Sequence, residues 1–175
     1  MIIDTSSKNE EVREVYAYFG LAIYSAQCLE HGLVNAFIYL DLIPSKIPVS
    51  HSKDWEDSVD SFTSKHFEHT LGRMIKDLEK VTNVPLNLSD KLVKALTLRN
   101  WLAHNYFRER AKEFLFSDGR KSMIKELEDV TRIINEADEQ LSITLDPILK
   151  KYGITEELIA KTSDEMLSKV KDHII

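Results

Sequence analysis

The sequence predicts an all-α protein, an antiparallel bundle of about five helices. Apolar residues recur at three- and four-residue steps over long stretches, which is the period of a helix that buries one face. Gly and Pro are rare, at 5 and 4 of 175 residues, so few positions interrupt such helices. No stretch alternates apolar and polar residues for long enough to predict a strand. No linker or repeat divides the chain, so we expect one domain over residues 1–175 with its core over about 9–150.

The first half of the chain predicts two helical stretches. The first covers 9–43, and Pro44 and Pro48 are expected to end it. Its inward positions are Val12, Val15, Tyr16, Phe19, Ile23, Ala26, Leu29, Leu33, Ala36, Phe37 and Leu40. The second stretch covers 53–82, and we expect a break near Ser61–Ser64.

The second half predicts two further long helices. One covers 90–115, with Ser89 or Asp90 as its N-cap because short polar side chains accept a bond from the first turn. The other covers 119–151 and has a nearly unbroken spacing that suits antiparallel packing. Its inward positions are Met123, Leu127, Val130, Ile134, Ala137, Leu141, Leu145 and Ile148.

An additional helix is predicted near the end of the sequence. Gly153 is expected to close the preceding helix, because glycine adopts the left-handed conformation that often terminates helices. Thr155 is a suitable N-cap for the last helix, which we expect to cover about 155–172.

Composition restricts the compartment and the partners. Cys28 is the single cysteine, so no internal disulfide can form. The first residues, MIIDTSSKNEEVREV, lack the basic and apolar regions of a signal peptide, and no apolar run reaches the roughly 20 residues that span a bilayer. We therefore expect a cytoplasmic protein with no membrane contact. The formal net charge of -6 argues against a protein that coats nucleic acid non-specifically.

One segment departs from this acidic background. Residues 98–110, LRNWLAHNYFRER, contain three Arg and a single acidic residue. Arg is a permanent bidentate ligand for phosphate, and His transfers protons near neutral pH. Arg99 and His104 together suit RNA cleavage: His takes the proton of a ribose 2′-hydroxyl, the oxygen attacks the neighbouring phosphate, and Arg stabilises the charge. This chemistry needs no metal and no other cofactor.

The spacing of these residues also predicts an assembly. Arg99 and His104 are five residues apart, so on an α-helix their directions differ by about 140°. Asn100 and His104 are i,i+4 partners, so the amide can orient the imidazole. Arg99 and His104 border one groove if a second helix supplies its opposite wall. The simplest supplier is the same helix of a second protomer, which predicts a two-fold homodimer.

The stretch RNWLAHNY, residues 99–106, resembles the R-x4-6-H motif of the HEPN superfamily of all-helical domains. In its R-x4-H-x-Y form it is similar to the HepT-like toxins that pair with minimal nucleotidyltransferase antitoxins. This resemblance implies a HEPN-like fold and a metal-independent endoribonuclease, acting as a dimer in a toxin–antitoxin or other defence system. It implies that Arg99 and His104 are catalytic. Asn100 matches the polar residue that follows the Arg, and Tyr106 matches the tyrosine that the antitoxin modifies with AMP in some pairs.

Other interpretations stay open for the basic segment. Arg99 and His104 can lie on a solvated helix face, and Tyr106 can be an amphipathic residue at the edge of the core. Arg108 and Arg110 either contact RNA or are surface charges. A non-catalytic HEPN-like module would use Arg99 only as a phosphate anchor, for a nucleotide or a protein partner.

Two further groups of polar residues have alternative interpretations. A polar stripe on the first helix either lines the substrate groove or forms a hydrogen-bonded interior seam or a wet face. Its members are Tyr24, Gln27, His31 and Asn35. His66 and His69 lack the further ligands that a metal site needs, so we expect none.

Overall fold

The computed structural model describes residues 5–46, 53–155, 157–162, 164, 167 and 168, and within them it contains helices and no strand. The all-α prediction is confirmed. The elements are α1 (Thr5–Phe37), a π-helical turn (Ile38–Leu42), α2 (Ile43–Lys46), α3 (Lys53–Phe67), α4 (Leu71–Val81), α5 (Leu86–His104), α6 (Tyr106–Glu109), a 3-10 turn (Glu113–Leu115) and α7 (Ser117–Lys151). None of the described helices is long and apolar enough to cross a membrane.

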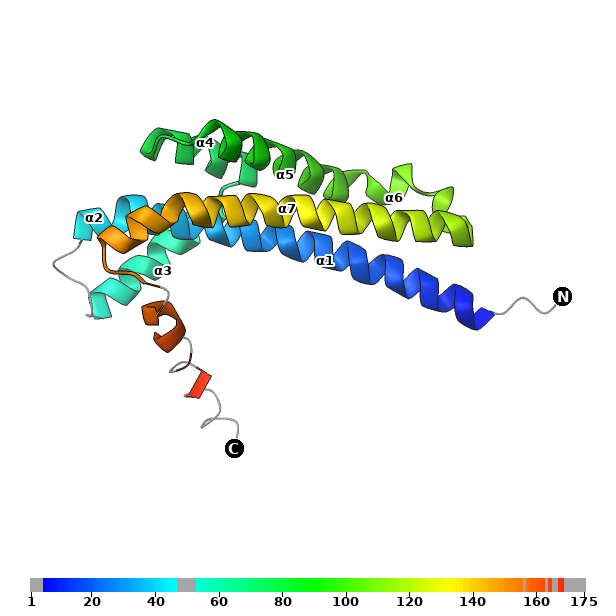
Figure 1. The fold of residues 1–175 in the computed structure, drawn as a ribbon, viewed down its shortest axis with the longest axis horizontal. Coiled ribbons are helices and arrows are strands. Elements are labelled where there is room, and N and C mark those ends of the chain that lie inside the picture. Colours follow the sequence, from blue (N-terminus) through cyan, green and yellow to red (C-terminus); the bar gives the residue numbers. More distant parts are fainter. Residues whose placement is uncertain (1–4, 47–52, 156, 163, 165–166, 169–175) are drawn as a thin grey trace.

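The two longest helices, α1 and α7, lie side by side, and α5 packs along them with α4 beside it (Figure 1). Helices α1 and α7 run parallel, because Glu11 near the start of α1 pairs with Arg120 near the start of α7. Helix α5 runs against both, and Tyr106, just after its end, stacks on Phe19 of early α1. The predicted antiparallel packing is therefore right for α5 and wrong for the α1–α7 pair. Apolar spacing defines which face is buried but does not encode the direction of the partner.

The core forms where the three long helices meet. The inward positions predicted for α7 are all buried up to Leu145, and Ile148 is partly buried. On α1 the buried set includes Leu29 and Leu33, whereas Tyr16 is 53% exposed. Each buried side chain of this size contributes about 1.5–3 kcal/mol, so this shared interface is the main source of stability.

The first helical stretch continues past Pro44 to Lys46, so the prediction that Pro44 ends it is wrong. The backbone N–H of Ile43 donates to the carbonyl oxygen of Ile38, five residues back, within the π-helical turn. Pro44 is then the second residue of a new helical segment, where the N–H that proline lacks is not required. Pro48 lies outside the described residues.

The break in the second stretch lies at 68–70, between α3 and α4, and not at Ser61–Ser64. Thr70 has an extended conformation, and its Oγ1 accepts the backbone N–H of Arg73 at 3.3 Å. This N-cap satisfies a donor of the first turn of α4, which is why the chain restarts a helix there. Ser61–Ser64 continue α3 without interruption.

Helix α5 starts at Leu86, four residues earlier than predicted. Pro85 precedes it with an extended ψ of 145°, and its carbonyl oxygen accepts the N–H groups of Leu88 and Ser89. Proline is favoured at a helix start because its φ is already helical. Ser89 and the following Asp90 therefore lie within the helix and do not cap it.

The termination of α7 follows the prediction. Gly153 has a φ of +72°, and the N–H of Ile154 donates to the carbonyl oxygen of Leu149, which satisfies the exposed end of the helix. Thr155 then caps the next helical segment, since its Oγ1 accepts the N–H of Leu158 at 3.3 Å. The predicted end of that last helix lies outside the described residues.

Two glycines give a matched test of the packing. A Cβ at Gly119 of α7 would lie 2.1 Å from the carbonyl oxygen of Glu113, whereas a Cβ at Gly20 of α1 would meet nothing within 4 Å. We expect Gly119→Ala to destabilise the protein by about 1–3 kcal/mol, because backbone must move apart. Gly20→Ala should stabilise it by about 0.5–1 kcal/mol through helix propensity. Urea unfolding of both variants measures this, and equal effects would contradict the close approach at Gly119.

Candidate functional site

The basic segment 98–110 is not one helix. Helix α5 ends at His104, and Asn105 leaves helical geometry with φ −128° and ψ −26°. The chain then forms the single turn of α6 and the 3-10 turn before α7. The prediction of a continuous helix to residue 115 is therefore wrong. Arg99 and His104 share α5, while Tyr106 and the residues after it belong to a redirected segment.

Arg99 and His104 flank the exposed side of α5 from opposite directions. Both lie within the regular helix, so the predicted divergence of about 140° applies. Asn100 lies between them and is exposed, as is His104. The side chain of Arg99 is 34% exposed and turns toward α1. His104 thus faces solvent and Arg99 is partly exposed next to α1, and the two do not converge on one point within a single protomer.

Arg99 is held by two oxygen atoms. Its Nη2 forms an ion pair with Oε1 of Glu30 on α1 at 3.2 Å, and its Nη1 donates to Oδ1 of Asn100 at 3.3 Å. Sequence reasoning did not single out Glu30. A signal was present, because residues 15–40 contain no other Asp, Glu, Lys or Arg. A lone charge in an apolar helix usually has a partner on a neighbouring element.

The expected contact between Asn100 and His104 is not formed. The Asn100 amide oxygen accepts from Arg99 instead. Within the described residues no side chain or backbone group forms a hydrogen bond with the His104 ring, which is exposed at the last position of α5. Both nitrogens of this imidazole are therefore accessible to a substrate.

Tyr106 lies in the core. Its side chain is 0% exposed, and its hydroxyl donates to the carbonyl oxygen of Met123 on α7 at 3.2 Å. The ring packs edge-on against Trp101, with centroids 4.9 Å apart. Burial and the nearby Glu126 carboxylate raise the pKa of the hydroxyl well above its ordinary value. In this conformation the hydroxyl is directed at α7.

The two other arginines of the segment have different surroundings. Arg110 forms two hydrogen bonds with Glu126 of α7, at 2.8 and 2.6 Å, and lies over the Trp101 ring. The edge of its guanidinium that carries Nε and Nη2 is therefore already bonded to the Glu126 carboxylate. Arg108 is exposed and donates from Nη2 to Oδ1 of Asn105 at 2.7 Å. Of the two predicted RNA contacts, Arg108 is the one whose charge faces solvent.

The polar stripe of α1 forms a solvent-exposed face, as one of the interpretations expected. Its four members, Tyr24, Gln27, His31 and Asn35, are all exposed. The His31 ring lies against Phe67 of α3, with centroids 4.5 Å apart. The interior-seam interpretation is therefore wrong.

No group of three or more His, Cys, Asp or Glu side chains within the described residues is placed to hold a metal ion.

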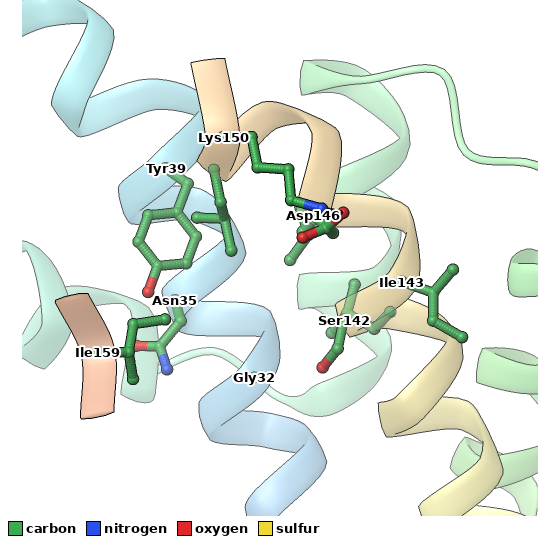
Figure 2. A pocket seen from close by; sticks show the side chains of 11 residues that line it. Gly32, Asn35, Tyr39, Ser142, Ile143, Asp146, Lys150 and Ile159 are labelled. Carbon is green, nitrogen blue, oxygen red and sulfur yellow. Dashed lines mark hydrogen bonds and ion pairs between the residues drawn. The ribbon is translucent and has the colours of Figure 1, made fainter. Parts of the chain in front are cut away.

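A separate cavity of about 530 Å³ lies between α1 and the second half of α7. Figure 2 shows Asn35 and Tyr39 on one wall and Ser142, Asp146 and Lys150 on the other. The Lys150 ammonium lies 2.7 Å from the Asp146 carboxylate, and burial raises the pKa of Tyr39. The lining contains no histidine, so this cavity does not provide the proton-transfer group of the predicted chemistry.

No protein-family model, curated protein or solved structure matches the chain. The structure brings Arg99, Asn100 and His104 to the exposed side of α5, and it separates Tyr106 and Arg110 from them by directing both toward α7.

Proposed function

We propose that the protein is a metal-independent endoribonuclease of the HEPN type, with a HEPN-like fold, which acts as a toxin or defence effector. The observation that carries the proposal is the exposure of His104 on the same helix as an arginine whose guanidinium is held in place. Exposed imidazole and a preorganised cation are the two groups that metal-free cleavage of RNA needs.

The proposed reaction assigns one role to each residue. The imidazole of His104 accepts the proton of a ribose 2′-hydroxyl, and the oxygen attacks the adjacent phosphorus. Arg99 stabilises the negative charge that develops on the phosphate oxygens. The bond to the 5′-oxygen of the next nucleotide breaks, this oxygen takes up a proton from solvent water, and a 2′,3′-cyclic phosphate remains; His104 then releases its proton to water. Asn100 supports Arg99, and the exposed Arg108 binds the RNA backbone.

Metal independence gives a direct test. We expect cleavage of a labelled RNA to persist in excess EDTA, because His104 and Arg99 perform the chemistry without a divalent ion. The products should end in a 2′,3′-cyclic phosphate or its opened form, which mass spectrometry can identify. Activity that EDTA abolishes and Mg²⁺ restores would reject this mechanism. Binding of RNA or a nucleotide without cleavage would support the non-catalytic module instead.

A homodimer is part of this proposal. Val93, Thr97, Asn100 and His104 recur at steps of four, three and four residues, so they share one exposed face of α5. None of them carries a fixed charge, and packing two α5 helices there would bring an Arg99 of one protomer near the His104 of the other. The antitoxin implied by the resemblance, a nucleotidyltransferase-like protein, is the proposed heterologous partner.

Light scattering tests the assembly. We expect a dimer at micromolar concentration, and Val93→Glu should convert it to a monomer because the added carboxylate would be buried in the interface without a partner. Lys94→Glu, a charge change at a neighbouring exposed position, is the control. A wild-type protein that is monomeric and fully active would contradict the shared site.

A further inference from the structure

Glu30 is the one Asp, Glu, Lys or Arg residue in the stretch 15–40, which makes up most of α1. Its chain neighbour Leu29 and the next-turn residue Leu33 are both fully buried, and Glu30 itself is only 20% exposed. Placing a carboxylate at the edge of the core costs free energy unless it has a partner. The partner is Arg99 of α5, at 3.2 Å.

The contact fixes the plane of the Arg99 guanidinium. Glu30 lies at Nη2 and Asn100 at Nη1, so both terminal nitrogens are held, while Nε has no partner within the described residues. An arginine that binds phosphate needs a defined plane, because its donors form a rigid fork. A partly exposed ion pair of this kind contributes little to stability. Its geometric effect on Arg99 is the larger consequence.

We propose that Glu30 is a positioning residue that acts through Arg99; this inference rests on the ribonuclease function proposed above. The carboxylate orients the guanidinium toward the scissile phosphate. The same negative charge opposes the binding of RNA, because it lies next to the cation that the phosphate approaches. Removing the charge of Glu30 should therefore lower kcat, because Arg99 loses its orientation, while RNA binding should become no weaker or should strengthen. Measuring kcat and RNA affinity separately distinguishes the two effects.

Glu30→Gln is the informative variant, because it keeps the size of the side chain and removes its charge. We expect kcat to fall about tenfold, by analogy with the loss of groups that orient a functional ligand. KM, and the Kd for a 2′-O-methyl RNA that cannot be cleaved, should stay the same or decrease. If Glu30 were only structural, Glu30→Gln would lower the melting temperature without lowering kcat selectively while KM stays the same or decreases.

Two other variants make the test specific. Glu14→Gln removes one negative charge from an exposed position of the same helix, and it should leave both kcat and KM at the wild-type values. Glu30→Asp keeps the charge on a shorter side chain, so it should lower kcat with little change in KM. It also provides a measurement if Glu30→Gln fails to fold.

The outcomes are distinct. An active wild type with equally active Glu30→Gln and Glu30→Asp variants would overturn the positioning role and leave the proposed function intact. A kcat loss that Glu14→Gln reproduces would overturn it too, because the effect would then be one of general charge. A wild type that cleaves no RNA would reject the proposed function and the positioning role together.

Discussion

His104→Ala is expected to lower the rate of RNA cleavage by about 10²–10⁴-fold, the contribution typical of a general acid–base group. The imidazole is exposed at the end of α5, and no described residue forms a hydrogen bond with it. Its removal should therefore leave the melting temperature unchanged. The measurement is single-turnover cleavage of a labelled RNA, together with a thermal melt of the same preparation.

Two variants of neighbouring residues complete this test. Arg99→Lys should be nearly as inactive, because the ammonium keeps the charge but loses the planar fork. Asn100→Ala should lose about tenfold, because it removes one of the two contacts that hold Arg99. If all three variants melt and cleave like the wild type, the segment 98–110 is only a basic stretch of surface.

Tyr106→Ala is expected to destabilise the protein by about 3–5 kcal/mol, the usual cost of removing a large buried ring. The ring lies among Phe19, Trp101 and Phe107, where neighbouring helices cannot close the cavity without moving. Tyr106→Phe keeps the ring and loses one hydrogen bond to Met123, so it should cost only about 0.5–1.5 kcal/mol. Chemical unfolding measures both values.

The Tyr106→Phe variant also tests the role that the family resemblance assigns to this tyrosine. If Tyr106 is structural, the variant should cleave RNA at the wild-type rate. A variant of native stability that loses cleavage, or that escapes inhibition by the proposed antitoxin, would show that the hydroxyl is used at the surface. Such a result would require α6 to move away from α7, since the hydroxyl contacts Met123 in this conformation.

The fold could be predicted where it depends on local pattern. The apolar spacing of α7 identified its buried face because a helix repeats every 3.6 residues, and Gly153 marked its end because few other residues adopt a positive φ. Breaks were harder to predict. Thr70 and Pro85 precede the first residues of α4 and α5. Other Ser, Thr and Asp residues nearby have a similar capping propensity. Tertiary packing therefore decides which of these residues begins a helix.

The site was predictable only in part. Arg99 and His104 could be chosen from the sequence because their chemistry and spacing lie within one helix. The contact of Glu30 with Arg99 joins residues on α1 and α5, and the bond from Tyr106 to Met123 joins α6 with α7. Neither can be inferred without knowing which helices are neighbours. The break at Asn105 decides the burial of Tyr106, and no proline or glycine marks it.

The parallel pairing of α1 with α7 has a consequence for folding during synthesis. A ribosome completes α1 early, but its principal partner, α7, follows only after α3, α4 and α5 have been made. At common elongation rates this delay is on the order of ten seconds. During that time the part of α1 that α7 covers has no native partner, although α4 and α5 can already pack on other parts of α1. The core is therefore completed only when α7, which contributes a large share of its buried residues, has been made.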